Sequence, residues 1–204
     1  SGIADTGMHR VVWYSRELTD ADLTAARHES GRRLLLHFGA VDYRCHVWVD
    51  GALVGSHEGG HTPFTLAVTH VARDGARVVV RVEDDPLDIS QPRGKQDWRE
   101  DPHVIWYHRT TGIWQPVWLE SVPPLHVRAL RWTTDPRVWT VTADIEQSER
   151  PLAGVSCEIH LSIDGRPRAT ARSVATESDL TGGLHPAEIR NVHYNTDLHW
   201  SPHA

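Results

Sequence analysis

Cysteine is scarce in this chain, which has two cysteines among 204 residues. Cys45 and Cys157 lie far apart in sequence and fall on the inward faces of two different predicted strands. Buried cysteines behave as small apolar residues, and disulfides are rare where the compartment is reducing. We therefore expect two buried free thiols in preference to a disulfide, and a cytoplasmic location.

The chain also lacks the segments that mark membrane insertion, secretion or nucleic-acid binding. No apolar run approaches the roughly 20 residues of a membrane-spanning helix, and no charged-then-apolar signal segment opens the sequence. The formal net charge is −6, and the arginines are scattered instead of forming the basic stripe that a nucleic-acid surface needs. We expect neither a membrane nor a nucleic acid as a partner.

Helical periodicity is weak, and only a short turn of helix is predicted, between Thr19 and Arg27. Most apolar residues recur at every second position instead. Residues 41–49 and 155–163 alternate in this way and each run is followed by an Asp-Gly pair, while residues 77–82 come after a third such pair. Many short strands separated by Gly, Asp and Pro indicate β-sandwiches, so the predicted fold is all-β.

The best domain boundary is Val122-Pro123-Pro124, because paired prolines break a strand ladder and stiffen a connector. Residues 1–121 are predicted to form a jelly-roll (galactose-binding-like) β-sandwich. Residues 122–204 are predicted to form a smaller, immunoglobulin-like β-sandwich. The second part has only 83 residues, where such a sandwich needs about 100, so we expect it to be incomplete.

Tryptophan is abundant, with nine residues against two phenylalanines. Three of them fall in the stretch Ile105–Glu120, which reads as two extended runs joined at residues 110–112. Alternation places Ile113, Gln115, Val117 and Leu119 on one face and Trp114, Pro116 and Trp118 on the other. Both faces are largely apolar, so this strand is predicted to be covered on two sides.

Residues 57–61 read HEGGH and match the metalloprotease pattern H-E-x-x-H. That pattern binds zinc because a helix places both histidines on one face. Two glycines between them make a helix very unfavourable, so we expect a glycine-rich bend and no zinc site. The other histidines, among them His37, His46 and His108, sit singly on predicted strands. We expect neither a metal nor a cofactor in this chain.

Several segments together resemble glycoside hydrolase family 2. The sequence RTTGIW at residues 109–114 and VWLE at 117–120 are similar to that family's sugar-binding jelly roll. WVDG at 48–51, VG at 54–55 and HEGGHTPF at 57–64 are similar to its hairpin and the bend that follows. Weaker likenesses are Ser1-Gly2-Ile3 and residues 12–16 near the start, and Trp200-Ser201-Pro202 near the end. The resemblance implies that the chain is clipped at both ends, with N-terminal jelly-roll strands missing.

The resemblance also implies the activity of a parent protein. Family 2 members are retaining β-glycosidases of the β-galactosidase, β-glucuronidase or β-mannosidase kind. Their two catalytic glutamates lie on a (β/α)₈ barrel that follows the two sandwiches. This sequence contains no alternation of strands and helices, so no catalytic residue is expected in it. The implied partners are a β-glycoside, the barrel of the same protein and further copies in a homo-oligomer.

A long loop between Asp84 and His103 is the predicted functional surface. It carries Arg93, Lys95, Gln96 and Trp98, a set of donors, an acceptor and an aromatic plate that can hydrogen-bond and stack on a sugar. The resemblance places such a loop toward the mouth of the barrel's active site. Trp106 stands six residues before Gly112, where several family members have a substrate-contacting aspartate. The five substrate-binding candidates are therefore Arg93, Lys95, Gln96, Trp98 and Trp106.

Other readings remain open at this point. The loop could equally pack against a neighbouring domain, and its carboxylates, Glu100 among them, could simply solvate it. Arg109 is predicted to be structural, tying the turn at residues 110–112 to a buried acceptor. The whole chain could also be a free-standing carbohydrate-binding module, or a structural, adhesion-type pair of sandwiches. An exposed Trp98 or Trp106 favours sugar contact, and burial of both would exclude it.

Overall fold

The computed structural model describes residues 9–99, 101–135, 137, 140–149, 154–174 and 187–189. The likenesses at Ser1-Gly2-Ile3 and Trp200-Ser201-Pro202, and Glu100 in the loop, lie outside the described residues. The chain divides into two compact units, Ser1–Pro123 and Pro124–Ala204, at the paired prolines. Nearly all regular structure is β-strand, which confirms the predicted all-β class.

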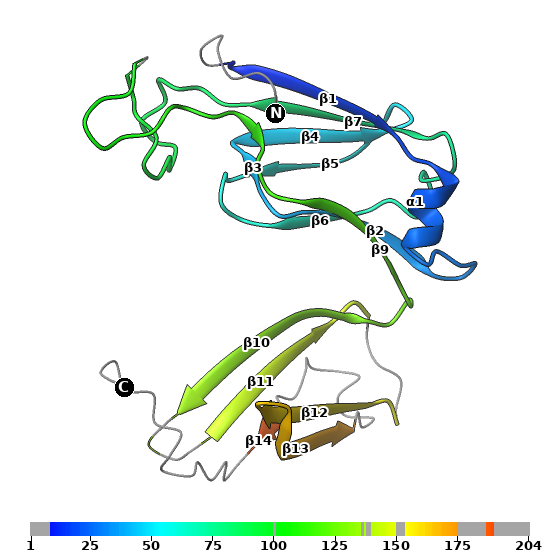
Figure 1. Ribbon diagram of the computed structural model, residues 1–204. Coiled ribbons are helices and arrows are strands. Elements are labelled where there is room, and N and C mark those ends of the chain that lie inside the picture. The colour runs from blue at the N-terminus through cyan, green and yellow to red at the C-terminus, as the bar shows by residue number, and fades with distance from the viewer. Residues whose placement is uncertain are drawn as a thin grey trace. The chain divides into compact units, whose positions relative to one another are not determined.

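Two antiparallel sheets form the first unit (Figure 1). The larger has the order β1-β7-β4-β5 and contains β1 (Val11–Glu17), β7 (Arg77–Glu83), β4 (Arg44–Val49) and β5 (Ala52–Glu58). The smaller has the order β6-β2-β9 and contains β6 (Phe64–Ala67), β2 (Arg33–Phe38) and β9 (Val117–Val122). A short pair, β3 (Val41–Asp42) and β8 (Gly112–Ile113), lies at the end of the unit from which the long loop leaves.

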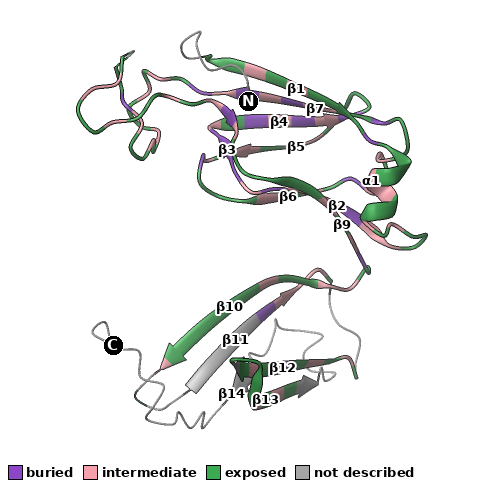
Figure 2. Ribbon diagram, in the orientation of Figure 1, coloured by how far each residue is buried: buried purple, intermediate pink, exposed green. Residues whose placement is uncertain are grey.

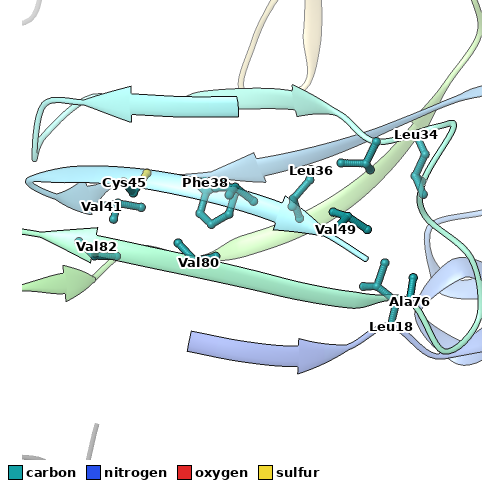
Figure 3. Packing of buried hydrophobic residues seen from close by; sticks show 12 residues of the cluster. Leu18, Leu34, Leu36, Phe38, Val41, Cys45, Val49, Ala76, Val80 and Val82 are labelled. Carbon is teal, nitrogen blue, oxygen red and sulfur yellow. The ribbon is translucent and has the colours of Figure 1, made fainter. Parts of the chain in front are cut away.

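The core of the first unit lies between these two sheets (Figure 3). Alternation supplies it from both layers, because every second residue of a strand points to the same face. Leu34, Leu36 and Phe38 of β2 face Val47 and Val49 of β4, and all five are buried. The period-two pattern in residues 45–49 therefore predicts the inward side chains correctly. It fails at Asp42, which is buried beside Val41 where the chain passes from β3 to β4.

The short predicted helix is present as α1 (Asp20–Ala25). Thr19 begins it with a capping box: its hydroxyl accepts a hydrogen bond from Asp22 N at 3.2 Å. The Asp22 carboxylate accepts one in return from Thr19 N at 3.0 Å. These two bonds satisfy backbone donors that the first helical turn leaves without partners, which explains why so short a helix forms.

The second unit contains two further antiparallel sheets. One joins β10 (Val127–Asp135), β11 (Thr140–Gln147) and β14 (Ala187–Ile189), and the other joins β12 (Ser156–Ile163) and β13 (Arg166–Val174). Ile145 of β11 and Ile159 of β12 are buried and form its small apolar cluster. The immunoglobulin-like and incomplete character of this part stays a prediction.

Both cysteines are free thiols, as predicted. Cys45 is fully buried in the core, and burial raises the pKa of its thiol to about 11, so it is protonated at neutral pH. Cys157 is only partly buried. Among the described residues, no helix is long and apolar enough to cross a membrane.

The tryptophan-rich stretch departs from the predicted continuous strand. β8 ends at Ile113, residues 114–116 are irregular, and β9 begins at Val117. Pro116 cannot donate to a ladder, and its carbonyl instead accepts a hydrogen bond from Gly39 N at 2.9 Å. Ile113 and Leu119 pack against the core as predicted, whereas Val117, predicted on the same face, is exposed. Trp114 and Trp118 are also exposed, so within this chain the second face of the stretch is not covered.

Candidate functional site

The long loop between β7 and β8, residues 84–111, extends from one end of the first unit (Figure 1). Its two arms are joined by a short parallel bridge between Gln96 and Tyr107. Asp97 N donates to Tyr107 O, and Tyr107 N donates to Lys95 O, both at 2.9 Å. The loop thus has a hydrogen-bonded base although none of its described residues belongs to a regular strand or helix.

Asp97 is the buried anchor of this base, with no solvent-exposed surface. One of its carboxylate oxygens accepts a hydrogen bond from Arg99 N at 3.0 Å. The other accepts from His103 N at 2.7 Å and lies 2.5 Å from His103 Nδ1. Burial alone would raise the pKa of Asp97, but these hydrogen bonds outweigh it and lower the pKa to about 2. Asp97 is therefore an ionised, fully bonded structural group.

Gln96, predicted to bind substrate, uses its side-chain amide within the protein. Its Nε2 donates to Asp42 Oδ2 at 2.8 Å, and its Oε1 accepts from Thr110 N at 2.7 Å. These bonds connect the loop to β3 on one side and to the turn before β8 on the other. The amide is thus placed as a support of the loop.

Arg93 is also turned into the loop. Its guanidinium donates to Pro86 O at 2.9 Å and to Asp88 O at 2.7 Å, which closes the first part of the loop on itself. Arg109 Nε donates to the carbonyl oxygen of buried Asp97 at 2.8 Å. The predicted structural role of Arg109, a tie between the turn at residues 110–112 and a buried acceptor, is confirmed.

Trp98 and Trp106, the two tryptophans predicted to contact sugar, lie next to each other on the loop. Their ring centroids are 5.8 Å apart with planes inclined by 64°. The side chain of Trp98 is 51% exposed, and that of Trp106 is partly buried. His103 packs edge-on against Trp98 at 5.1 Å, so the same histidine that bonds to Asp97 also fixes the indole. Lys95 is exposed in the arm that carries the bridge.

Several apolar side chains of this loop are exposed to solvent, which was not predicted from the sequence. Ile89 is 92% exposed and Val104 is 90% exposed. Leu87, Ile105 and Tyr107 are also exposed, and the loop is coloured mainly as exposed or intermediate in Figure 2. A signal was present, since these apolar residues interrupt a segment that is rich in Asp and Pro and has no period of two. Large exposed apolar groups that lie close together mark interaction surfaces.

Two further carboxyl groups are buried: Asp42 on β3 and Asp84, the first residue of the loop. Burial raises the pKa of Asp84 to about 6, and the neighbouring charge of Asp42 adds to the shift. Burial also raises the pKa of Asp42, while the hydrogen bond from Gln96 opposes it. The cavity between these groups and Arg93 measures only about 10 Å³, room for about one water molecule. A sugar can therefore meet the outer surface of this loop and cannot enter beneath it.

The H-E-x-x-H segment forms the predicted bend. β5 ends at Glu58, and Gly59 follows with φ of +126°, a conformation that favours glycine. His57 Nε2 lies 3.1 Å from Thr62 Oγ1, and Gly60 O accepts a hydrogen bond from Trp114 Nε1 at 2.7 Å. No group of three potential metal ligands occurs among the residues that the structure describes.

A second concave feature is an apolar groove of about 490 Å³. It lies between β1 and β9, which are the outermost strands of their sheets, and core residues such as Leu36, Phe38 and Val80 line it. Its charged lining residues are Arg16 and Asp22, which pair with each other at 2.6 Å. Sugar sites need several convergent polar groups, so the loop is the better candidate for sugar contact.

No family model matches the chain, but it has relatives named β-glucuronidase and β-galactosidase. A putative β-glucuronidase of Formosa agariphila is 32% identical over 125 residues, covering 60% of this chain and 13% of the relative. The β-glucuronidase of Canis lupus familiaris is 24% identical over 197 residues, covering 89% and 29%. A β-galactosidase of Thermoanaerobacter pseudethanolicus is 28% identical over 128 residues, covering 61% and 16%.

Solved structures show the same fold at low sequence identity. A glycosyl hydrolase family 2 member from Bacteroides cellulosilyticus matches 88% of this chain and 24% of its own, with a TM-score of 0.61 at 20% identity. A Faecalibacterium prausnitzii β-glucuronidase matches 90% of this chain and 32% of its own, with a TM-score of 0.62 at 22% identity. The chain spans less than a third of the curated relatives that it matches. In sequence and in fold, this chain is similar to the N-terminal β-sandwich region of glycoside hydrolase family 2 enzymes, which confirms the resemblance drawn from its sequence.

Proposed function

We propose that this chain is the non-catalytic N-terminal part of a family 2 β-glycosidase. Its two sandwiches would hold the loop of residues 84–111 at the substrate entrance of a (β/α)₈ barrel elsewhere in the same protein. The observation that carries this proposal is the loop itself. Its base is held by hydrogen bonds, and Trp98 and several apolar side chains on it are exposed to solvent.

The carboxyl groups of this region support a non-catalytic role. Retaining glycosidases need two carboxyl groups about 5–5.5 Å apart on either side of the scissile bond, with one of them able to give up a proton. Asp97 is fully buried and its oxygens are occupied by backbone and histidine donors. Asp42 and Asp84 line a cavity that is too small for a sugar ring. The acid and the nucleophile would therefore come from the barrel.

The five candidate residues divide into two roles in this proposal. Trp98, Trp106 and Lys95 would contact the substrate, because an indole face stacks on a sugar ring and an ammonium donates to hydroxyl or carboxylate oxygens. Arg93 and Gln96 would position them, because their polar atoms already bind the carbonyls of residues 86 and 88, Asp42 and the Thr110 N–H.

Hydrolysis of chromogenic substrates tests the activity. The isolated chain and the full-length protein would be assayed with p-nitrophenyl β-glucuronide, β-galactoside and β-mannoside. We expect turnover of at least one substrate by the full-length protein, with the β-anomer released first, and no turnover by the isolated chain. Hydrolysis by the chain alone, or an inverted product from the full-length protein, would contradict the proposal.

A free-standing carbohydrate-binding module is the alternative that the exposed Trp98 also favours. The two functions differ in the rest of the protein. If the full-length protein hydrolyses none of the three glycosides but the chain binds their sugars, the binding-module function replaces the enzyme proposal.

A further inference from the structure

The outer face of the larger sheet carries a row of aromatic side chains that neither the core nor the loop uses. The strand register places Trp13 of β1 opposite Arg81 of β7, and Arg81 opposite His46 of β4. Trp48 lies two residues beyond His46 on β4 and therefore points to the same face. The intervening residues Val47 and Val82 fill the core, so this aromatic row faces away from it.

The rings of this row lie next to one another and are nearly parallel. The centroids of Trp13 and Trp48 are 5.9 Å apart, with planes inclined by 22°. Those of His46 and Trp48 are also 5.9 Å apart, with planes inclined by 25°. The Arg81 guanidinium lies 5.7 Å from the centroid of Trp13, at cation–π distance. The three rings therefore present one aligned aromatic strip on the sheet.

This strip is open to solvent at one end and apolar at its border. Trp13 is 59% exposed, and Leu53, paired with Trp48 across β4 and β5, is 58% exposed. A sheet face with no partner normally carries polar side chains. Two tryptophans and a leucine on such a face therefore indicate a surface that binds a ligand.

The charges around the strip cancel. Arg81 pairs with Glu83, Arg44 pairs with Glu58 at 2.8 Å, and Arg77 pairs with Glu17 at 3.4 Å. A nucleic acid would require an excess of positive charge, which these pairs remove. A stable protein partner would bury about 800 Å² per side, whereas this apolar strip is only a few side chains wide and is bounded by satisfied ion pairs. A neutral, flat, partly apolar ligand fits the strip best.

We propose that the aromatic strip of Trp13, Trp48 and His46 is a second carbohydrate-binding surface, for the pyranose rings of a neutral β-linked oligosaccharide. The C–H face of a pyranose would stack on the indoles. Its hydroxyls would bond to side chains on the same face: His46, and Ser56, which is paired opposite His46. This surface is independent of the loop and of the parent protein's activity, because every group in it lies on β1, β4, β5 and β7.

Titration of the isotopically labelled chain with cellohexaose, followed by NMR of the indole N–H signals, tests the proposal. We expect saturable shifts of the Trp13 and Trp48 signals and none at Trp132, on β10 of the second unit. Trp13→Ala and Trp48→Ala should each raise the Kd about three- to tenfold, as loss of one aromatic stacking contact predicts. Trp132→Ala is the matched control, a half-exposed indole on β10 of the second unit, and should leave the Kd unchanged.

Trp13→Tyr keeps a ring at the exposed end and should retain part of the affinity, which separates ring loss from unfolding. The dispersion of the backbone amide spectrum would show that each variant is folded. Shifts confined to Trp98 and Trp106, saturable binding that survives both alanine changes, or no shift with cellohexaose at millimolar concentration would overturn the proposal. None of these results bears on hydrolysis by the full-length protein, so this failure and that of the proposed function are distinguishable.

Discussion

The sandwich and the loop of the first unit are built in opposite ways. The sandwich turns valines, leucines and Phe38 inward and its charged pairs outward. The loop turns the carboxylate of Asp97 inward and leaves Ile89 and Val104 outside. The sandwich therefore gains stability from burial of apolar surface, whereas the loop depends on hydrogen bonds to buried polar groups. Changes in the two regions should consequently differ in kind.

Removal of a core ring should have the largest effect. Phe38 is fully buried between the sheets and stacks on Phe64 with ring centroids 4.7 Å apart. Phe38→Ala should lower the free energy of unfolding of the first unit by about 3–5 kcal/mol, through lost burial and a cavity. Urea denaturation followed by tryptophan fluorescence measures this. Leu53→Ala, on the exposed face, is the control and should change stability by less than about 0.5 kcal/mol.

A methyl group at Gly112, where the loop meets β8, should have the next largest effect. Gly112 has φ of +124°, and an added Cβ would lie 2.1 Å from the Tyr14 hydroxyl. Gly112→Ala should cost about 1–3 kcal/mol, because both the backbone and Tyr14 must shift. Gly51→Ala has a similar backbone penalty, with φ of +79°, but open space around the new methyl group. Equal losses in the two variants would contradict the steric contribution of Tyr14.

Asp84 should make stability depend on pH between about 4 and 6. Its folded pKa is raised to about 6, above the unfolded value of about 3.9, so the folded state binds the extra proton in this range. Stability from this group is therefore highest at low pH and falls as pH rises toward 6. Asp84→Asn should remove that loss and raise stability at pH 7 by up to about 3 kcal/mol, the equivalent of about two pKa units. Denaturation at pH 4, 5, 6 and 7 tests this, and the same gain in Asp85→Asn, at the exposed neighbour, would refute the role of burial.

Loss of the Asp97 charge should loosen the loop and leave the sandwich folded. Asp97→Asn cannot accept the bonds from Arg99 N, His103 N and the His103 ring in the same way. Hydrogen exchange should become faster at the Tyr107 and Asp97 amides, which form the bridge, while amides of β2 and β4 keep their protection. Asp101→Asn, at an exposed carboxylate of the same loop, should change neither. Uniform loss of protection throughout the first unit would show that the two regions are not separable.

The same contrast explains what could be predicted from the sequence. Alternation in residues 45–49 identifies Cys45, Val47 and Val49 as core residues, because apolar side chains recur on the face of the strand that is buried. The loop has no such period, so the neighbours Asp97 and Trp98 could not be assigned to inside and outside. Their placement depends on bonds between distant residues, such as Gln96 with Asp42, 54 positions away. The break at Pro116 belongs to the same class, because it depends on the hydrogen bond that Gly39 N donates to the distant Pro116 O.

Substrate kinetics of the full-length protein can test whether the loop of residues 84–111 borders the substrate entrance. Trp98 and Trp132 are both about half exposed, but Trp98 lies on the loop and Trp132 on β10 of the second unit. If the loop borders the substrate entrance, Trp98→Ala should lower kcat/KM roughly tenfold, mainly through KM, as loss of about 1.4 kcal/mol of sugar stacking predicts. Trp132→Ala should leave kcat/KM unchanged, and neither variant should change the melting temperature of the first unit. Equal kcat/KM values for the two variants would contradict the account.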